Sequence, residues 1–190
     1  MRLSSVSSFV LAAALGVGML SNAAAAEYTS LDAQASRITF GYSQMNVNLD
    51  GYFEQMQATD FSFDPASPEE ARAVIEIPLS SIDAGYEEAN AELEKEEWLH
   101  PTEHPLATFT SSEVKALEDG SYQVTGDLSI KGYTKTVTAP FTFREEGDTG
   151  IFEGQFTFQR ADFGVGEGQW KDFSIVANDI QLRFHIVAKP

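Results

Sequence analysis

The chain has 190 residues, no cysteine and a formal net charge of −17, from 29 acidic against 12 basic side chains. This length fits one domain with a sizeable core, and the acidic excess repels nucleic acids and anionic lipid surfaces. The absence of cysteine excludes disulfides and cysteine nucleophiles.

Residues 1–26 have the features of a secretory signal peptide. Arg2 gives a positive start, Phe9–Leu20 is an apolar run, and Ala24–Ala26 has the small-residue pattern of a cleavage site. Cleavage before Glu27 would leave one domain, residues 27–190. An N-terminal membrane anchor is the alternative, but the run is shorter than the roughly 20 apolar residues that span a bilayer. An exported domain without disulfides fits the bacterial periplasm.

Alternation of apolar and polar residues predicts strands through most of the domain, because successive side chains leave a strand on opposite sides. A short first strand is predicted at 27–31. Eight longer strands follow at residues 37–42, 52–63, 71–79, 106–111, 122–131, 136–143, 152–158 and 180–187.

Residues 122–143 give the clearest pattern. Their two arms each have one apolar and one polar face, and Gly132–Thr134 is a short connection that contains a glycine. We therefore predict an antiparallel hairpin whose apolar face must be buried by other strands.

One helix is predicted at Glu87–Glu97, a run of good helix formers with no β-branched residue. Asp83 is the expected N-cap, and Pro101 and Pro105 prevent continuation. We expect the helix to lie on the surface, with its acidic side chains in solvent.

Sequential antiparallel strands with one-sided alternation predict a sandwich or a closed up-and-down barrel. Phenylalanine occurs 14 times and mostly at inward positions, which favours an eight-stranded antiparallel β-barrel with one short helical excursion. Such a barrel either fills itself with side chains or holds one small ligand. Pro78 and Pro140 lie within predicted strands and lack a ladder donor, so we expect an edge, seam or bulge at each.

Three motifs could carry chemistry. His100–His104 has the spacing H-x-x-E-H, but the flanking prolines allow at most one helical turn, so we interpret it as a loop rather than a zinc site. Gly164–Gly168 lacks the strand-to-helix setting of a dinucleotide loop and is interpreted as a flexible turn. For Arg160 and Asp162 we predict an ion pair at the barrel end, with contact to a ligand head group as the alternative. No nucleophile–base pair can be named, so we expect neither an enzyme nor a metal or cofactor site.

Several stretches of the chain, taken in order, resemble the YceI-like family. They are Ile38–Phe40, Ser81–Gly85, His104–Phe109, Gly126–Gly132 with Thr134–Lys135, and Arg160–Gly164. The resemblance covers nearly all of residues 27–190. It implies a periplasmic lipocalin-like barrel, often dimeric, that binds an isoprenoid or another long-chain lipid. The family often has a lysine and histidine pair on the second strand, where this chain has Tyr42–Met45, and this difference points to a neutral ligand such as a quinone or a fatty acyl amide rather than a polyprenyl phosphate.

The expected function is therefore transport or sequestration of an amphiphilic long-chain lipid, such as a quinone or polyprenyl compound, inside the barrel. The mouth candidates are Trp98, Trp170 and Tyr86. The expected ligand-binding residues are Phe40, Tyr42, Phe53, Phe61, Ile75, Trp98, Phe109, Leu128, Ile130, Phe141, Phe143, Phe156, Phe158, Phe163, Trp170 and Phe184.

Two alternatives to a lipid carrier differ in where the apolar residues point. An outer-membrane barrel would need apolar residues outside, but the outward face of the 122–143 hairpin is polar. A stress-related or protein-interaction barrel with a core filled by phenylalanine is the second alternative, and the number of phenylalanines permits it.

Overall fold

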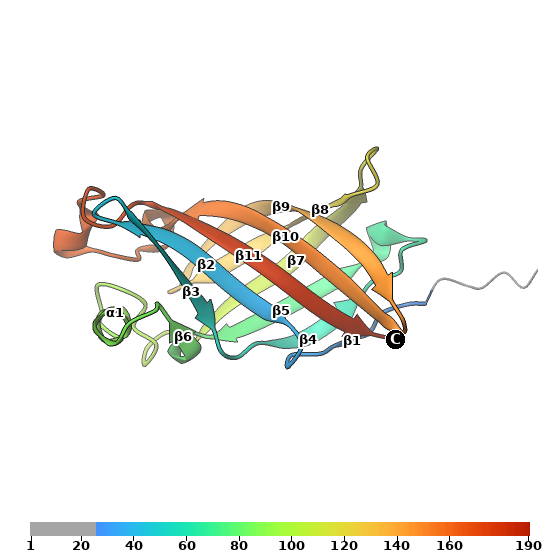
Figure 1. Ribbon diagram of the computed structural model, residues 1–190, viewed down its shortest axis with the longest axis horizontal. Coiled ribbons are helices and arrows are strands. Elements are labelled where there is room, and N and C mark those ends of the chain that lie inside the picture. The colour runs from blue at the N-terminus through green and yellow to red at the C-terminus, as the bar shows by residue number, and fades with distance from the viewer. Residues whose placement is uncertain (1–25) are drawn as a thin grey trace, which may run out of the picture.

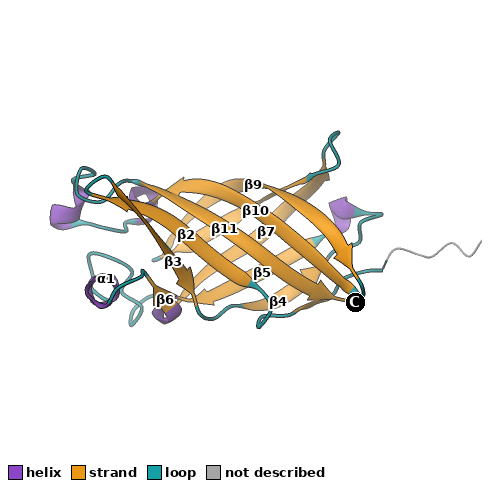
Figure 2. Cartoon of the chain, viewed as in Figure 1, coloured by secondary structure: helices purple, strands orange, loops and turns teal. Residues whose placement is uncertain are grey.

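The computed structural model describes residues 26–190, in which one antiparallel sheet curls around a common interior (Figures 1 and 2). The predicted signal peptide, apart from Ala26, lies outside the described residues. The strands are β1 (Ser30–Leu31), β2 (Arg37–Gln44), β3 (Val47–Phe53), β4 (Gln57–Ser62), β5 (Arg72–Pro78), β6 (Ile82–Asp83), β7 (Leu106–Ala116), β8 (Tyr122–Ile130), β9 (Tyr133–Glu146), β10 (Thr149–Gln159) and β11 (Asp179–Lys189). The helices are α1 (Glu87–Leu93) and the 3₁₀ turns η1 (Pro68–Glu70), η2 (Leu79–Ser81), η3 (Arg160–Phe163) and η4 (Gly168–Lys171).

The strand order is β4-β5-β7-β8-β9-β10-β11-β2-β3-β6, and short segments join the two edges of this sheet. β6, which follows β5 in the chain, pairs with β3 at one end. At the other end β1 pairs with β11, and the nearby Tyr28 exchanges two backbone hydrogen bonds of 2.9 Å with Phe63, just after β4. The sheet thus curls into a barrel, and the segment with Tyr28 and β1 bridges its edge beside β4.

The predicted all-β class and antiparallel barrel are confirmed, but the strand count is wrong. The sheet has 11 strands because the predicted strand 52–63 is divided into the end of β3 and all of β4, and because β6 adds a further short strand. The looser alternation in this region has a physical basis, since the chain turns away between Phe53 and Gln57.

The predicted hairpin is β8 and β9, paired from Tyr122↔Phe141 to Ile130↔Tyr133. Its turn is Lys131-Gly132, one residue earlier than predicted, and both residues have positive φ, as a two-residue hairpin turn of this twist requires. The inward side chains of β8 become more buried towards this turn, where Leu128 and Ile130 are buried.

The two prolines mark the ends of pairing, as expected. Pro78 is the last residue of β5. Pro140 lies where the ladder between β9 and β10 stops, because that ladder runs only from Thr149↔Glu146 to Gly154↔Phe141. Beyond Pro140 the first half of β9 pairs with β8 alone, and η3 packs beside it.

The helix is shorter than predicted, and its N-cap prediction is wrong. Helix α1 ends at Leu93, and its N-cap residue is Tyr86. Asp83 instead accepts hydrogen bonds from the Gly85 backbone N–H and the Asn90 side chain, so it fixes the turn before the helix. Within residues 26–190 no helix is long and apolar enough to cross a bilayer.

Candidate functional site

The interior of the barrel contains two apolar cavities that follow one another along its length. The deep cavity, near the end that carries the C-terminus, has a volume of about 160 Å³ and is lined by residues such as Phe61, Ile75, Phe109, Phe141 and Phe184. The mouth cavity, near α1, has a volume of about 360 Å³. Four residues line both cavities: Ile77, Ala107, Leu128 and Leu182.

The cavities include most of the residues that we predicted to bind a ligand. Phe61, Ile75, Phe109, Phe141, Phe156 and Phe184 line the deep cavity, and Phe40, Tyr42, Phe53, Trp98, Ile130, Phe158 and Trp170 line the mouth cavity, with Leu128 at the junction. Tyr86 also lines the mouth cavity.

Phe143 and Phe163 are the two predicted residues that line neither cavity. Phe143 packs against Tyr28, Phe63 and Phe152, with ring centroids 4.9–5.4 Å apart. Phe163 is only 1% exposed and meets Phe158 edge-on. Phe143 thus belongs to the aromatic cluster at the closed end of the barrel, and Phe163, on η3, packs in the core cluster that includes Leu128 and Ile130.

Glycines opposite phenylalanines keep the interior hollow. Phe40, Phe109 and Phe184 lie over Gly51, Gly126 and Gly154. Because a glycine has no side chain, the ring can lie flat against the sheet and does not project into the cavity. The abundance of phenylalanine is therefore compatible with an open interior.

We expect Gly126→Ala to destabilise the barrel, because the new Cβ would overlap the Thr110 backbone oxygen and the Phe109 ring. Overpacking of this kind typically costs about 1–3 kcal/mol in the free energy of unfolding, measurable in urea. Gly41→Ala is the matched control, since its Cβ would meet only ordinary contacts at 3.5 Å or more. Equal urea midpoints for the two variants would contradict this packing role.

The end of the barrel beyond the deep cavity is closed by aromatic side chains. Tyr28 and Phe63 are 2% and 3% exposed. The ring centroids of Phe63 and Phe152 are 4.9 Å apart, in an edge-on arrangement. The backbone bonds between Tyr28 and Phe63 hold this aromatic cluster in place. A molecule inside the barrel would therefore have its exit at the mouth.

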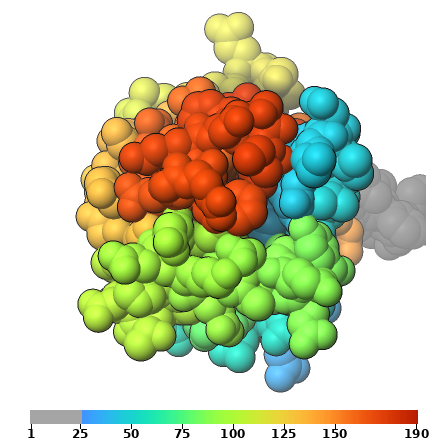
Figure 3. All heavy atoms as spheres, turned by 90° about the vertical axis from the view of Figure 1, so that its left-hand side faces the viewer, coloured from blue at the N-terminus to red at the C-terminus, as the bar shows by residue number. Residues whose placement is uncertain are grey.

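Three segments cover the mouth: residues 80–105 with α1, the loop 164–178, and the turn between β2 and β3 (Figure 3). Hydrogen bonds join them in pairs. The Met45 N–H donates to the Ile175 oxygen (2.8 Å), the Tyr86 hydroxyl to Gln44 Oε1 (2.6 Å), and the Gly166 N–H to the Glu97 oxygen (2.7 Å).

Two buried cations, Lys131 and Arg160, hold these segments together. No pattern in the amino-acid sequence indicated this role. Lys131 is 8% exposed, and its Nζ donates to the backbone oxygens of Glu96 (2.6 Å) and Gly164 (2.9 Å). It thereby links the α1 segment to the loop 164–178.

Arg160 is 1% exposed, and the ion pair that we predicted with Asp162 is wrong. Its guanidinium donates five hydrogen bonds of 2.6–3.1 Å to backbone oxygens, while Asp162 is exposed. The acceptors are the carbonyl groups of Val165, Gly166, Trp170, Val176 and Ala177. Burial lowers the pKa of Arg160, yet the group stays charged at neutral pH because its ordinary value is so high.

The polar groups of the interior are concentrated at the mouth. Glu88, Glu92 and Gln44 line the mouth cavity, together with Tyr42, whose hydroxyl donates to the Ala84 oxygen (2.9 Å). Burial and the neighbouring Tyr86 raise the pKa of Tyr42 to about 12, so it is neutral at physiological pH. The lining of the deep cavity is almost wholly apolar.

His100–His104 is one isolated turn: the backbone N–H groups of Glu103 and His104 both donate to the His100 oxygen, and no helix includes these residues. Among residues 26–190, no three His, Asp or Glu side chains are placed to hold a metal ion.

A family model described as the YceI-like domain matches residues 29–188. A UPF0312 protein of Pseudomonas syringae pv. tomato is 31% identical, with 90% of this chain and 96% of that protein covered. The crystal structure of Burkholderia cenocepacia BcnA matches with a TM-score of 0.80 and 38% identity, over 84% of this chain and 100% of BcnA. A polyisoprenoid-binding domain from Saccharophagus degradans, 16% identical, shares the fold with a TM-score of 0.66, over 86% of this chain and 99% of that one.

Proposed function

This chain belongs to the YceI-like domain family, and from that premise we propose that it binds one amphiphilic long-chain lipid, an isoprenoid, inside its barrel. The observation that carries the proposal is the pair of adjoining cavities, apolar at depth and polar only at the mouth. The fold shared with a polyisoprenoid-binding domain supports it. The tail would occupy the deep cavity and the head group the mouth cavity.

Apolar contact is sufficient to hold such a tail. Burial of each CH₂ group contributes roughly 0.8 kcal/mol, so several isoprene units bind without a polar anchor. The proposed activity is therefore binding rather than catalysis.

The head group of the proposed ligand is neutral, as in a quinone or a fatty acyl amide. Glu88 and Glu92 line the mouth cavity and would repel a phosphate. Arg160 lines the same cavity, but all five of its N–H groups already donate to backbone oxygens. A phosphate would find no free guanidinium donor there.

We further propose that the protein acts in the periplasm after cleavage of the predicted signal peptide, where it carries or sequesters its lipid. A water-filled compartment is the setting in which an isoprenoid needs a carrier, because its tail is insoluble in water. Export of the chain, and loss of residues 1–26, can be read from the mass of the protein recovered from a periplasmic extract.

Organic extraction of the purified protein, followed by mass spectrometry, tests the binding proposal. We expect one isoprenoid lipid in near-stoichiometric amount. If extraction yields no lipid, a benzoquinone with a geranylgeranyl tail is titrated into the delipidated protein. Absence of an extracted lipid together with no binding of this quinone would favour the alternative of a ligand-free interaction module.

A further inference from the structure

A methionine occupies a turn at the mouth whose backbone suits asparagine or glycine. Met45 and Asn46 are the two-residue turn between β2 and β3, and both have positive φ, at 50° and 64°. Such turns strongly favour Asn and Gly, because longer side chains are strained in the left-handed region. Met45 is also 71% exposed, so packing within the described chain offsets little of this strain. Uncompensated strain of this kind is typical of functional sites, which suggests that Met45 meets another molecule.

The residue after this turn extends the apolar inner face of the barrel beyond the mouth cavity. Val47 pairs with Gln44, which lines that cavity. Val47 also has the strand parity of Phe53, another cavity residue, because β2 and β3 pair without a register shift between these positions. Val47 is nevertheless 57% exposed. The apolar wall therefore continues out of the cavity and ends in solvent.

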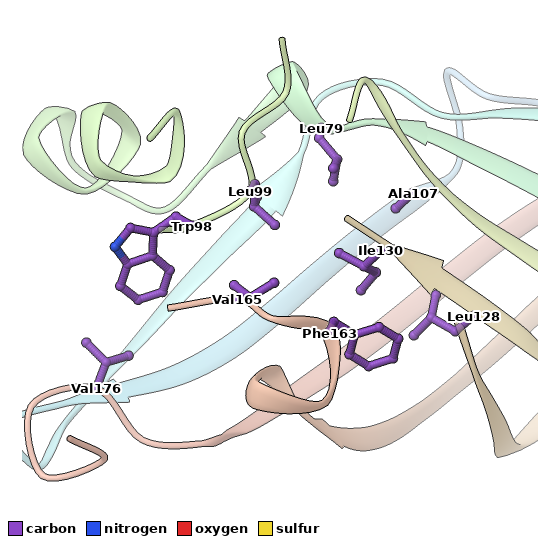
Figure 4. Close-up of a cluster of buried hydrophobic side chains, with 9 residues drawn as sticks. All are labelled: Leu79, Trp98, Leu99, Ala107, Leu128, Ile130, Phe163, Val165 and Val176. Carbon is purple, nitrogen blue, oxygen red and sulfur yellow. The ribbon is translucent and has the colours of Figure 1, made fainter. Parts of the chain in front are cut away.

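A third exposed apolar side chain, Phe173, lies on the adjoining loop 164–178. Figure 3 shows this loop beside the β2–β3 turn. The loop is anchored behind Phe173, because Val176 is buried in the core cluster of Figure 4 and forms a backbone bridge with Gln44. We call the three exposed side chains Met45, Val47 and Phe173 the apolar lip. The anchoring holds the apolar lip in place in solvent.

The apolar lip lies in segments with no net charge, although the chain is strongly acidic. Residues 43–49 and 168–176 contain one lysine and one aspartate. The segment with α1, on the other side of the mouth, is different, because residues 87–97 contain six glutamates and one lysine. This segment and the acidic excess of the whole chain repel negatively charged surfaces. The apolar lip therefore suits a partner surface that is apolar and carries no net charge.

We propose that the apolar lip docks the mouth of the barrel on a lipid bilayer without net charge, such as one of phosphatidylethanolamine. This inference rests on the proposed function, since an isoprenoid is insoluble in water and has to pass directly between a membrane and the mouth. A stable protein–protein interface uses about 800 Å² and roughly 20–30 residues on each side, whereas the apolar lip is three side chains on two turns. Attachment to a bilayer scales with the apolar area that is buried, so three side chains give the weak, reversible docking that a carrier needs.

Flotation of the delipidated protein with vesicles of phosphatidylcholine and phosphatidylethanolamine measures docking separately from isoprenoid binding. The test variant combines Met45→Asn and Val47→Thr, which suit the backbone of a left-handed turn and of a strand. Phe173 is kept, because its ring packs on the Arg160 guanidinium, 5.3 Å from the ring centre. We expect the double variant to bind the vesicles roughly tenfold more weakly than wild type, with its midpoint of unfolding in urea no lower.

Leu117→Asn is the matched control, because it also removes an exposed apolar side chain from a turn. Leu117 directly follows β7 and lies at the closed end, where the last pair of the β7–β8 ladder includes Tyr122 of the aromatic cluster. We expect its vesicle binding to change by less than about twofold. Phosphatidylglycerol in the vesicles should weaken binding of the wild-type protein, and added salt should restore part of the loss by screening the repulsion.

A fluorescent label tests the same docking with the apolar lip intact. The chain has no cysteine, so Asn46→Cys carries a polarity-sensitive dye at a single position, the tip of the β2–β3 turn. We expect its emission to shift to shorter wavelength when the vesicles are added, because the dye enters a less polar environment. The same dye on Glu118→Cys, in the exposed turn at the closed end, should not shift.

Docking and isoprenoid binding fail in distinguishable ways. Equal vesicle binding by the double variant and Leu117→Asn, or an unshifted dye at residue 46, would overturn the docking. Stronger binding to vesicles with phosphatidylglycerol would overturn it as well. A wild-type dimer that becomes monomeric in the double variant, without vesicle binding, would make the apolar lip an interface between two copies of the chain. If the protein binds the vesicles but not the geranylgeranyl quinone, the proposed function fails instead.

Discussion

Ala107→Phe should abolish binding of a long isoprenoid tail while leaving a short one nearly unaffected. Ala107 is buried on β7 and lines both cavities, so a phenyl ring at this position would fill the junction between them. The tail would then lose contact with the deep cavity. At roughly 0.8 kcal/mol per CH₂, losing only four such groups lowers affinity by more than about a hundredfold.

The measurement is titration of two quinones into each variant, one with a geranylgeranyl tail and one with a single prenyl group. Leu106→Phe is the matched control, because Leu106 is the neighbouring residue on the same strand but is 39% exposed. Thermal unfolding shows whether Ala107→Phe folds. If overpacking prevents folding, Ala107→Val should give a smaller loss in the same direction. Equal affinities of Ala107→Phe and Leu106→Phe for the long-tailed quinone would mean that the tail does not cross the junction.

The barrel could be predicted from the sequence because its strands alternate with a period of two. In β8 the apolar residues face inward and the polar residues face outward, so the pattern itself identifies the wall of the interior. The same logic located Phe109, Leu128 and Phe141 on the cavity wall. A two-residue period cannot show how far a side chain projects, which is why Phe143 was assigned to the wall as well. Phe163 lies outside any strand, on η3, where alternation gives no information.

The open interior could not be predicted, because it depends on register. Gly154 lies directly opposite Phe184, and Gly51 opposite Phe40, on strands far apart or joined by turns. Only the paired structure shows that each ring covers a glycine. From the sequence alone, the same phenylalanines are equally consistent with a filled core.

The loops at the mouth carry no periodic signal, so the residues that hold them could not be identified in advance. Lys131 has the polar parity of its predicted strand, and the nearby Asp162 made an ion pair at the barrel end the simplest interpretation of Arg160. Their true partners are backbone oxygens, which every residue has and no sequence distinguishes.

Arg160→Met should destabilise the protein by at least about 3 kcal/mol, because five backbone oxygens lose their donor and each unpaired buried group costs roughly 1–3 kcal/mol before the loop relaxes. For a domain of this size the corresponding fall in melting temperature is about 6–12 °C. Arg183→Met is the control: Arg183 is a half-exposed arginine paired with Asp50, and such surface pairs contribute at most about 1 kcal/mol. The loop 164–178 is one wall of the mouth, so Arg160→Met should also release a bound quinone faster. Matching melting temperatures for the two arginine variants would show that water replaces the guanidinium at no cost, and that the mouth is not held by Arg160.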